Sequence, residues 1–234
     1  AKRMKVNGIS PRLYGETLNT ILFAGAATLA VLVFGTVVAY AARALPGRAT
    51  ALFQRLSTLG YAMPGTVLAI GILIPVAALD GLIDRASQML FGVPTGLLLI
   101  GSGAALGYAY VARFLAIAAG SIESGYSRIP RSFDQVARSL GRTVGGTFCA
   151  VHLPLSKTAL AAAGLLVFVD CMKELPATLL LRPLNFETLA THLYGEAARG
   201  TYEEAAVAAL AIVLVGTLPV MLLARIGRRE SGED

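Results

Sequence analysis

The chain has 234 residues, of which 56% are hydrophobic and 15% charged, and its formal net charge is +6. An average soluble domain carries about 25% charged residues, so this composition argues against an ordinary cytoplasmic enzyme, and the high hydrophobicity excludes intrinsic disorder. Two cysteines, Cys149 and Cys171, are too few for a disulfide scaffold, and we interpret them as small buried apolar side chains.

Five apolar runs are long enough to cross a membrane, since a bilayer core of about 30 Å needs about 20 mostly apolar residues in a helix. They cover residues 17–42, 57–79, 95–119, 158–181 and 205–226. We therefore predict an all-α polytopic membrane protein with one five-helix transmembrane domain, residues 17–226, in contact with the lipid bilayer. Residues 1–16 form an N-terminal segment and residues 227–234 a C-terminal tail.

The distribution of Lys and Arg predicts the topology. The first and third connections and the C-terminal tail are rich in these residues, and cytoplasmic loops carry such an excess. We expect a periplasmic N-terminus and a cytoplasmic C-terminus. The basic N-terminal segment opposes this choice, and a membrane domain upstream of Ala1 would remove the conflict. Because the basic residues lie between apolar runs, we expect no nucleic-acid partner.

The third connection, residues 120–157, is the longest and contains a predicted amphipathic helix. Pro130 breaks the chain, Ser132 is placed to cap a helix with Gln135 in a capping box, and Gly141 can end that helix or open a turn. Helical spacing puts one set of apolar side chains on the same face: Phe133, Val136, Ala137, Leu140 and Val144. This helix either lies on the lipid headgroups or offers its apolar face to a cytoplasmic partner.

The fourth apolar run is unusual because it contains Asp170, Lys173, Glu174 and Pro176 within two helical turns. The spacing allows ion pairing along one face, and Pro176 is expected to kink or break the helix. Charges at membrane depth are expensive and usually face a cavity or a partner, so we interpret these four residues as lining a translocation pathway. The alternative is that they mark the solvated outer end of the span.

The third connection resembles the loop motif of binding-protein-dependent ABC transporter permeases. That motif reads Glu-Ala-Ala, three residues, Gly, nine residues, Ile, one residue and Leu-Pro. In this chain the same spacing joins Gln135-Val136-Ala137, Gly141, Val151 and Leu153-Pro154. Gln135 and Val136 depart from the motif, because they replace its Glu and its first Ala.

The resemblance implies that this loop is the coupling helix, which docks in a groove of the ATPase subunit. A helix tied to two membrane spans moves as a lever when its apolar face is held. Gly141 would permit close backbone approach, and Pro154 would stiffen the return to the fourth span. The expected coupling residues are Phe133, Gln135, Val136, Ala137, Leu140, Gly141, Val151, Leu153 and Pro154.

A narrower resemblance points to the permeases of ferric-iron ABC importers. It is carried by residues 61–69, 173–183 and 185–190, and it extends over most of the chain from residue 18 to residue 226. Those permeases are commonly single chains with two membrane halves, and this chain resembles the C-terminal half. Permeases for thiamine, phosphonates or polyamines share parts of the pattern and remain alternatives.

This resemblance implies the permease component of an ATP-driven importer in the bacterial inner membrane. Ferric iron would be delivered by a periplasmic solute-binding protein, and a second permease half would face this one across the pathway. ATP and Mg would be bound by separate ABC ATPase subunits. We therefore expect no cofactor in this chain.

The chain lacks the sequence motifs of several other functions. It has no P-loop and no metal-binding spacing, and its two histidines, His152 and His192, are far apart, so we expect neither ATP hydrolysis nor a metal site in this chain. An ion-coupled secondary transporter would use Asp170, Lys173 and Glu174 as a cation relay and need no ATPase. A membrane-embedded enzyme would need a cluster of catalytic residues, and a scaffold would tolerate removal of Glu174.

Overall fold

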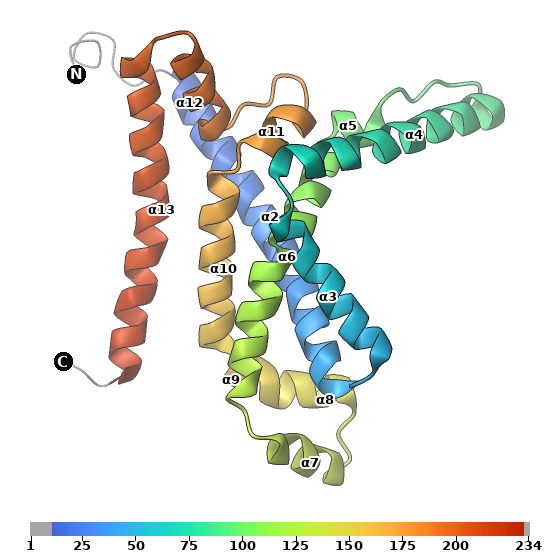
Figure 1. Ribbon diagram of the computed structural model, residues 1–234, viewed down its shortest axis with the longest axis vertical. Helices are drawn as coiled ribbons and strands as arrows, with labels where there is room; N and C mark the ends of the chain where they lie inside the picture. Colours follow the sequence, from blue (N-terminus) through green and yellow to red (C-terminus); the bar gives the residue numbers. More distant parts are fainter. Residues whose placement is uncertain (1–10, 232–234) are drawn as a thin grey trace.

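The computed structural model describes residues 11–231, and every regular element in this range is helical. Four long helices run along the long axis of the molecule (Figure 1): α2 (Pro11–Ala44), α6 (Ala104–Ser127), α10 (Lys157–Met172) and α13 (Tyr202–Ser231). Beside them, α3 (Arg48–Ala62) follows α6, and α4 (Gly65–Phe91) crosses one end of the molecule. The predicted all-α class is confirmed.

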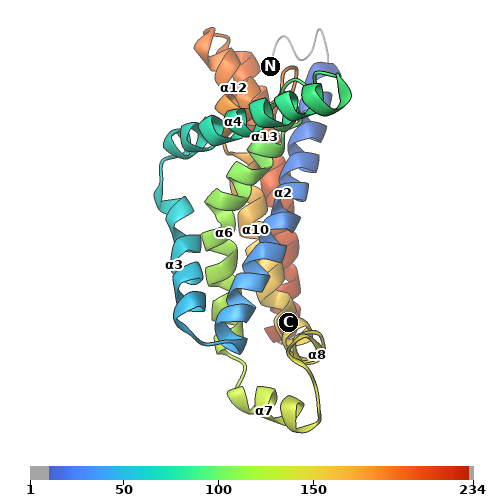
Figure 2. The same cartoon turned by 90° about the vertical axis from the view of Figure 1, so that its right-hand side faces the viewer.

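The short helices lie at the two ends, and Figure 2 shows the same separation from the side. We call one end the α4 end; it holds α4, α5 (Leu98–Gly101), α11 (Pro176–Leu181) and α12 (Leu189–Ala198). The α7 end holds α7 (Arg131–Ser139), α8 (Val144–Thr147), the π-helical turn η1 (Phe148–His152) and α9 (Leu153–Leu155). Both α2 and α13 start at the α4 end and finish at the α7 end.

The helix α6 is the centre of the bundle, because α2, α3 and α10 all pack against it. Leu106, Phe114 and Ile122 of α6 are buried together with Val31 of α2 and Val167 of α10. Burial of such side chains stabilises the bundle by about 1.5–3 kcal/mol each where water is excluded. A movement of α6 therefore displaces the side chains of three neighbouring helices.

Two glycines bring the neighbouring helices unusually close to α6. A Cβ atom added at Gly60 of α3 would lie 1.8 Å from the carbonyl oxygen of Ala112. One added at Gly125 of α6 would lie 2.5 Å from Cβ of Ala159 in α10. Close contact between small residues is a common way to join helices in a membrane, so these positions fix the helix spacing.

The second predicted run, residues 57–79, is not one straight span, so that prediction is wrong. Here α3 ends at Ala62, Met63 and Pro64 are extended, and α4 begins at Gly65 in a new direction (Figure 1). A residue before proline is driven toward extended backbone, and proline has no N–H to continue a helix. The break therefore follows directly from Pro64.

Two further predicted runs are also interrupted. The third begins with the separate helix α5, and Gly103, with φ of +81°, precedes α6. The fourth breaks between Met172 and Pro176, as the proline predicted. The helix α12 lies in a connection for which no helix was predicted.

Some of the described helices are long and apolar enough to cross a membrane. Three qualify alone, Arg12–Ala44, Gly65–Phe91 and Ala104–Ser127, and a fourth crossing results if the pair 144–155 and 157–172, bent by 76°, is counted as one.

Candidate functional site

The predicted coupling loop contains α7, whose two ends are set by a proline and a glycine. The helix starts directly after Pro130, and no side chain caps it, so the predicted capping box at Ser132 and Gln135 is wrong. The extended backbone of Pro130 sets the start, which leaves Ser132 inside the first turn. The predicted turn at Gly141 is confirmed: its φ is +76°.

The hydrogen bonds after α7 explain the need for glycine. The Gly141 N–H donates to the carbonyl of Arg138 at 2.9 Å, and the Arg142 N–H donates to that of Ala137 at 3.0 Å. This pair of bonds is the Schellman arrangement, in which the residue after the cap takes a left-handed conformation. A side chain at Gly141 would strain that conformation, although nothing lies within 4 Å to obstruct it.

The apolar face of α7 is exposed, as its predicted role requires. Phe133, Val136 and Leu140 are 48%, 56% and 77% exposed, whereas Ala137 is buried. Beside them lies a groove of about 370 Å³ between α7 and η1. Five of the nine expected coupling residues line it: Phe133, Val136, Ala137, Leu140 and Val151. Gln135, Gly141, Leu153 and Pro154 lie outside its lining.

A second helical stretch, formed by α8, η1 and α9, returns the chain to the bundle. Thr143 caps it by accepting a hydrogen bond from the Gly146 N–H at 3.1 Å. Its final turn does not lead straight into α10, because the chain bends by 76° at Ser156. The N–H of Leu153 donates to the carbonyl of Phe148, a π-helical bond, just before Pro154, which has no N–H. The structure therefore places Pro154 before a bend.

Three charged or polar side chains, which we call the Arg43 cluster, hold α7 to the bundle: Arg43, Asp134 and His152. The guanidinium of Arg43, at the end of α2, contacts Asp134 Oδ2 through Nη2 at 2.8 Å and through Nε at 3.1 Å. Asp134 Oδ1 lies 2.6 Å from His152 Nε2. Arg43 also donates to the backbone carbonyls of Tyr126 and Ile129, so one side chain joins α2, the end of α6 and α7.

The electrostatics of the Arg43 cluster favour an ionised Asp134. Burial raises the pKa of the Asp134 carboxyl, but the contacts with His152 and Arg43 outweigh burial and hold the pKa below the usual Asp value. The imidazole of His152 is fully buried between the rings of Tyr40 and Tyr126, with centroids 5.2 and 5.3 Å away. This cluster was missed in the sequence, where Arg43 counts only as a loop charge.

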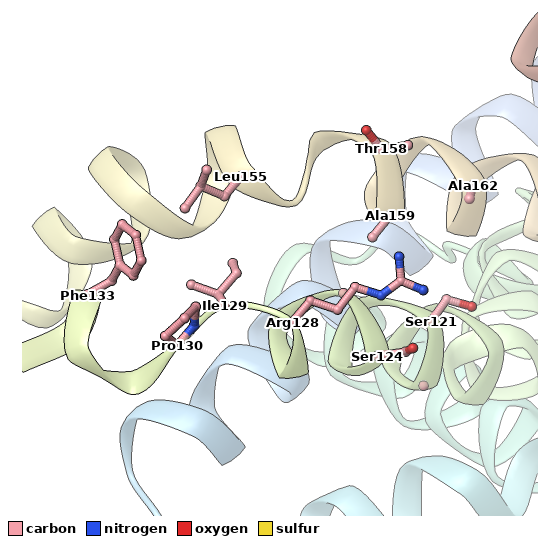
Figure 3. A pocket seen from close by; sticks show the side chains of 12 residues that line it. Ser121, Ser124, Arg128, Ile129, Pro130, Phe133, Leu155, Thr158, Ala159 and Ala162 are labelled. Carbon is pink, nitrogen blue, oxygen red and sulfur yellow. The ribbon is translucent and has the colours of Figure 1, made fainter. Parts of the chain in front are cut away.

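An open cavity of about 920 Å³ borders α7 on another side (Figure 3). It lies between the second half of α6 and the start of α10, and Phe133 and Leu155 line it near α7. The rest of its lining includes the small residues Gly120, Ser121, Ser124, Gly125, Ala159 and Ala162. The helix α7 is therefore held by the Arg43 cluster and borders open space.

A second arginine joins the two breaks at the α4 end; we call Arg113, Glu174 and Gly65 the Arg113 junction. Arg113 of α6 contacts Glu174 Oε2 through Nε at 3.0 Å, and its Nη1 donates to the carbonyl of Met63 at 2.9 Å. Glu174 lies between α10 and α11, its side chain is 6% exposed, and its Oε1 accepts the Ala177 N–H at 3.2 Å. Arg113 was noticed in the sequence only as one charge in the third run.

The four expected pathway residues do not form one cluster. Lys173 Nζ lies 2.7 Å from Asp170 Oδ1, as the spacing allows, and these side chains are 63% and 20% exposed. Glu174 instead pairs with Arg113. Pro176 is the first residue of α11, where its missing N–H costs no helical hydrogen bond.

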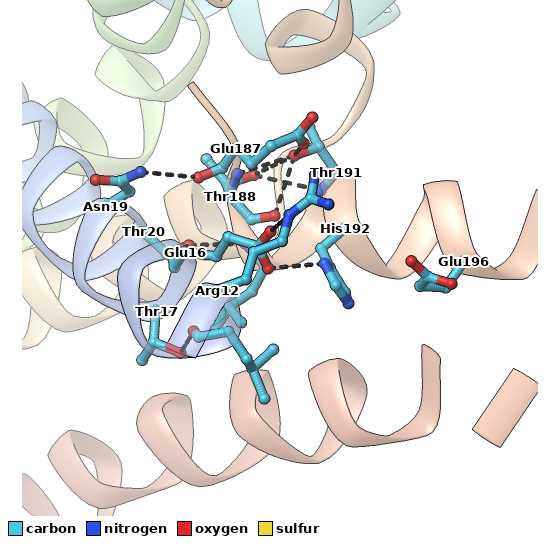
Figure 4. A network of polar contacts seen from close by, with 12 residues as sticks. Arg12, Glu16, Thr17, Asn19, Thr20, Glu187, Thr188, Thr191, His192 and Glu196 are labelled. Carbon is cyan, nitrogen blue, oxygen red and sulfur yellow. Dashed lines mark hydrogen bonds and ion pairs between the residues drawn. The ribbon is translucent and has the colours of Figure 1, made fainter. Parts of the chain in front are cut away.

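A third polar cluster ties the start of α2 to α12 (Figure 4). Glu16 Oε2 lies 2.7 Å from His192 Nδ1, and the Thr20 hydroxyl accepts the Leu189 N–H at 2.8 Å. Asn19 Nδ2 donates to the carbonyl of Glu187 at 3.2 Å. His192 therefore lies at the α4 end and His152 at the α7 end of the bundle, far apart as predicted.

Comparison with known proteins gives a family match and two relatives. Residues 31–230 match the family described as binding-protein-dependent transport system inner membrane component. The Fe(3+)-transport system permease protein FbpB 2 of Haemophilus influenzae is 34% identical over 115 residues, which are 49% of this chain and 23% of that protein. PhnV of Salmonella typhimurium, named for 2-aminoethylphosphonate transport, is 29% identical over 109 residues, 47% of this chain and 41% of that protein.

Solved structures share the fold. The chain aligns with a bacterial ABC transporter involved in alginate import, at a TM-score of 0.73 and 13% identity, over 97% of this chain and 83% of that one. The same transporter with an alginate-bound periplasmic protein gives a TM-score of 0.76 and 14% identity, over 98% and 83%. The inward-facing MetNI methionine ABC transporter gives 0.60 and 16%, over 94% and 99%.

Proposed function

Because this chain belongs to the family of binding-protein-dependent transport system inner membrane components, we propose that it is a permease subunit of an ATP-driven importer that carries ferric iron. The observation that carries the transport role is α7 itself. It presents an exposed apolar face at one end of an apolar bundle, and the Arg43 cluster fixes its position. A helix of this kind is suited to being held by another protein.

In this proposal α7 docks in a groove of an ABC ATPase subunit, which also covers the groove between α7 and η1. Phe133, Val136 and Leu140 would lose contact with water on docking, while Gly141 and Arg142 keep the end of α7 in place. ATP and Mg are bound by the ATPase, and this chain contributes no cofactor. The other expected coupling residues, Gln135, Leu153 and Pro154, would act at the rim of the contact or in the bend before α10.

The same proposal sets the orientation in the inner membrane. The α7 end faces the cytoplasm, where the ATPase hydrolyses ATP, and the α4 end faces the periplasm, where a solute-binding protein delivers the substrate. The start of α2 then lies on the periplasmic side and the end of α13 on the cytoplasmic side. The Arg-rich α7 end supports this choice through the positive-inside rule.

Ferric iron is supported by the 34% identity to an Fe(3+)-transport permease. The relative named for 2-aminoethylphosphonate transport supports phosphonate import as the second candidate. Both candidates need a second permease half across the pathway. Asp170 and Lys173, whose side chains are 20% and 63% exposed, are placed to line it, whereas Glu174 and Pro176 form the break beside them.

The test is co-purification of the full-length permease with the ATPase encoded beside it. Val136→Asp places a charge on the exposed face of α7 and should abolish association. Leu184→Asp is the matched control, because Leu184 is 95% exposed but lies between α11 and α12 at the other end. If neither the parent nor the control retains the ATPase, the importer proposal fails and an ion-coupled transporter replaces it.

The substrate is tested in proteoliposomes that contain the assembled transporter. Radioactive ferric iron loaded on the neighbouring binding protein should enter only when ATP is present. Entry of 2-aminoethylphosphonate in place of iron would reassign the substrate without changing the transport role.

A further inference from the structure

We infer that Arg113 is a positioning residue that makes the two helix breaks at the α4 end one rigid unit attached to α6. Through this unit, a movement of α6 would displace α4 and α11 together. The inference rests on the proposed transport function, because it concerns how movement reaches the far end of the bundle.

The contacts of Arg113 reach both breaks from a third helix. Its Nη1 donates to the carbonyl of Met63, the last residue before Pro64, and its Nε contacts Glu174, which follows the end of α10. The two breaks are therefore held through one guanidinium, and α6 carries that guanidinium. Each break leaves backbone groups at a helix end without a helical partner, and side chains satisfy two of them: Arg113 binds the Met63 carbonyl and Glu174 accepts the Ala177 N–H.

The start of α4 and the start of α11 are packed closely against each other at the Arg113 junction. A Cβ atom added at Gly65 would lie 2.9 Å from Glu174 Oε1, 3.2 Å from Pro176 Cβ and 3.3 Å from Arg113 Nη1. The start of α4 thus rests directly on the start of α11. Separation would break at least one of the two Arg113 contacts, and loss of the contact with Glu174, which is only 6% exposed, is strongly unfavourable at a buried site.

A chain of hydroxyl contacts extends the unit along α6. The Tyr110 hydroxyl lies 2.7 Å from Thr178 Oγ1, and the Thr178 hydroxyl donates to the carbonyl of Glu174 at 2.6 Å. Tyr110 and Arg113 are three residues apart and lie on one side of α6. Both therefore hold the α10–α11 break to α6.

The other end of α6 leads directly to the coupling loop. Only residues 128–130 separate α6 from α7, and Arg43 binds the carbonyls of Tyr126 and Ile129 as well as Asp134 of α7. A displacement of α7 is thus passed to α6 over a short, cross-bonded connection. Arg113 then passes it to α4 and α11.

The first test asks whether the unit stays closed. Gly65→Cys with Pro176→Cys should form a disulfide after a shift of a few tenths of an ångström, because the Cβ separation of 3.2 Å is just below the range of about 3.5–4.5 Å in disulfides. The exposed Cys149 is changed to Ser in this background. Linked peptides are measured by mass spectrometry in the assembled transporter, without nucleotide and with ATP, Mg and vanadate.

A rigid unit predicts the same yield of cross-link in both nucleotide states and ATP-driven uptake that survives oxidation. A yield that drops in either state, no cross-link in both, or uptake that is lost on oxidation and restored by a reductant would overturn the inference. The parent transporter is assayed in parallel with ferric iron. If it shows no ATP-driven uptake of ferric iron or of 2-aminoethylphosphonate, the proposed function fails, whereas cross-linking still reports on the unit.

The second test separates positioning from stability. Arg113→Met should lower iron uptake about tenfold while ATP hydrolysis continues, because the pull from α6 no longer reaches the breaks. Arg113→Lys should restore part of the uptake per ATP hydrolysed, and Arg85→Met, which removes an exposed cation of α4, is the control and should leave uptake unchanged. Uptake and hydrolysis that fall in parallel would show a structural role alone and would count against the inference.

Discussion

The α7 end and the α4 end use the same device with opposite outcomes. At each end an arginine from a long helix binds a carboxylate and at least one backbone carbonyl from other elements: Arg43 binds Asp134, and Arg113 binds Glu174. Around Arg113 the junction is tightly packed, and Glu174 is only 6% exposed. Around Arg43 the helix α7 keeps three large apolar side chains in contact with solvent.

The two arginine clusters have different consequences for the helices that they hold. A guanidinium that satisfies several acceptors can hold a chain segment without apolar packing, because charge-assisted bonds are strong and directional. At the α4 end this holds two broken helices against α6. At the α7 end it frees the apolar face of α7 from holding the helix in place, so that this face remains available to a partner.

Removing the carboxylate at the α4 end should have the largest effect on stability. Glu174→Ala leaves Arg113 unpaired at a mostly buried site, and we expect unfolding to become easier by about 3–5 kcal/mol. Thermal unfolding in detergent measures this loss. Asp170→Ala, which removes a partner of the exposed Lys173, is the control and should cost about 0–1 kcal/mol. Equal losses in the two variants would remove the distinction between the clusters.

Breaking the ion pair at the α7 end should lower the free energy of unfolding by a smaller amount. Arg43→Met breaks a pair whose side chains are 12% and 17% exposed, and we expect about 2–3 kcal/mol, mostly as local loosening of α7. Hydrogen exchange of residues 131–139 measures it. Arg48→Met, an exposed cation at the same end, should leave exchange unchanged. Protection of α7 that survives Arg43→Met would show that packing, not the cluster, holds the helix.

Gly141→Asp tests the end of α7 rather than its anchor. A left-handed conformation costs a residue with a Cβ about 1–2 kcal/mol, so the Schellman turn should distort while the bundle folds and inserts normally. Uptake should fall strongly at normal protein levels. Gly141→Asn matches the size without the charge and tolerates this backbone better, so its loss should be smaller. Normal uptake by Gly141→Asp would argue against a coupling role for α7.

The smallest expected effect is the pH dependence of the Arg43 cluster. Since the pKa of Asp134 is lower in the folded protein than in the unfolded chain, its contribution is fully present above the ordinary Asp pKa of about 3.9 and disappears as pH falls through the folded value. Thermal stability of the parent should approach that of Asp134→Asn only in acid. A constant difference between the two proteins at every pH would contradict the ionised pair.

Local chemistry made several features predictable. The turn after α7 requires a positive φ at Gly141, which glycine adopts without strain. Pro176 breaks the fourth run because it has no N–H. The apolar spacing of α7 is visible because helical periodicity is local. Pro64 carries the same local signal, yet the continuous apolar composition of residues 57–79 masked the break. Pro64 itself could have predicted the break, because proline is a local signal.

Composition and short-range spacing alone predicted an all-α membrane protein with an amphipathic helix in its third connection. These depend on residues close together in the chain, where the helical repeat and the length needed to cross a bilayer act directly. The pairing of Arg43 with Asp134, 91 residues away, and of Arg113 with Glu174, 61 residues away, depends on the packing of the helices. Such pairs follow from how helices pack around α6, and an isolated charge in the sequence does not specify which distant carboxylate will balance it.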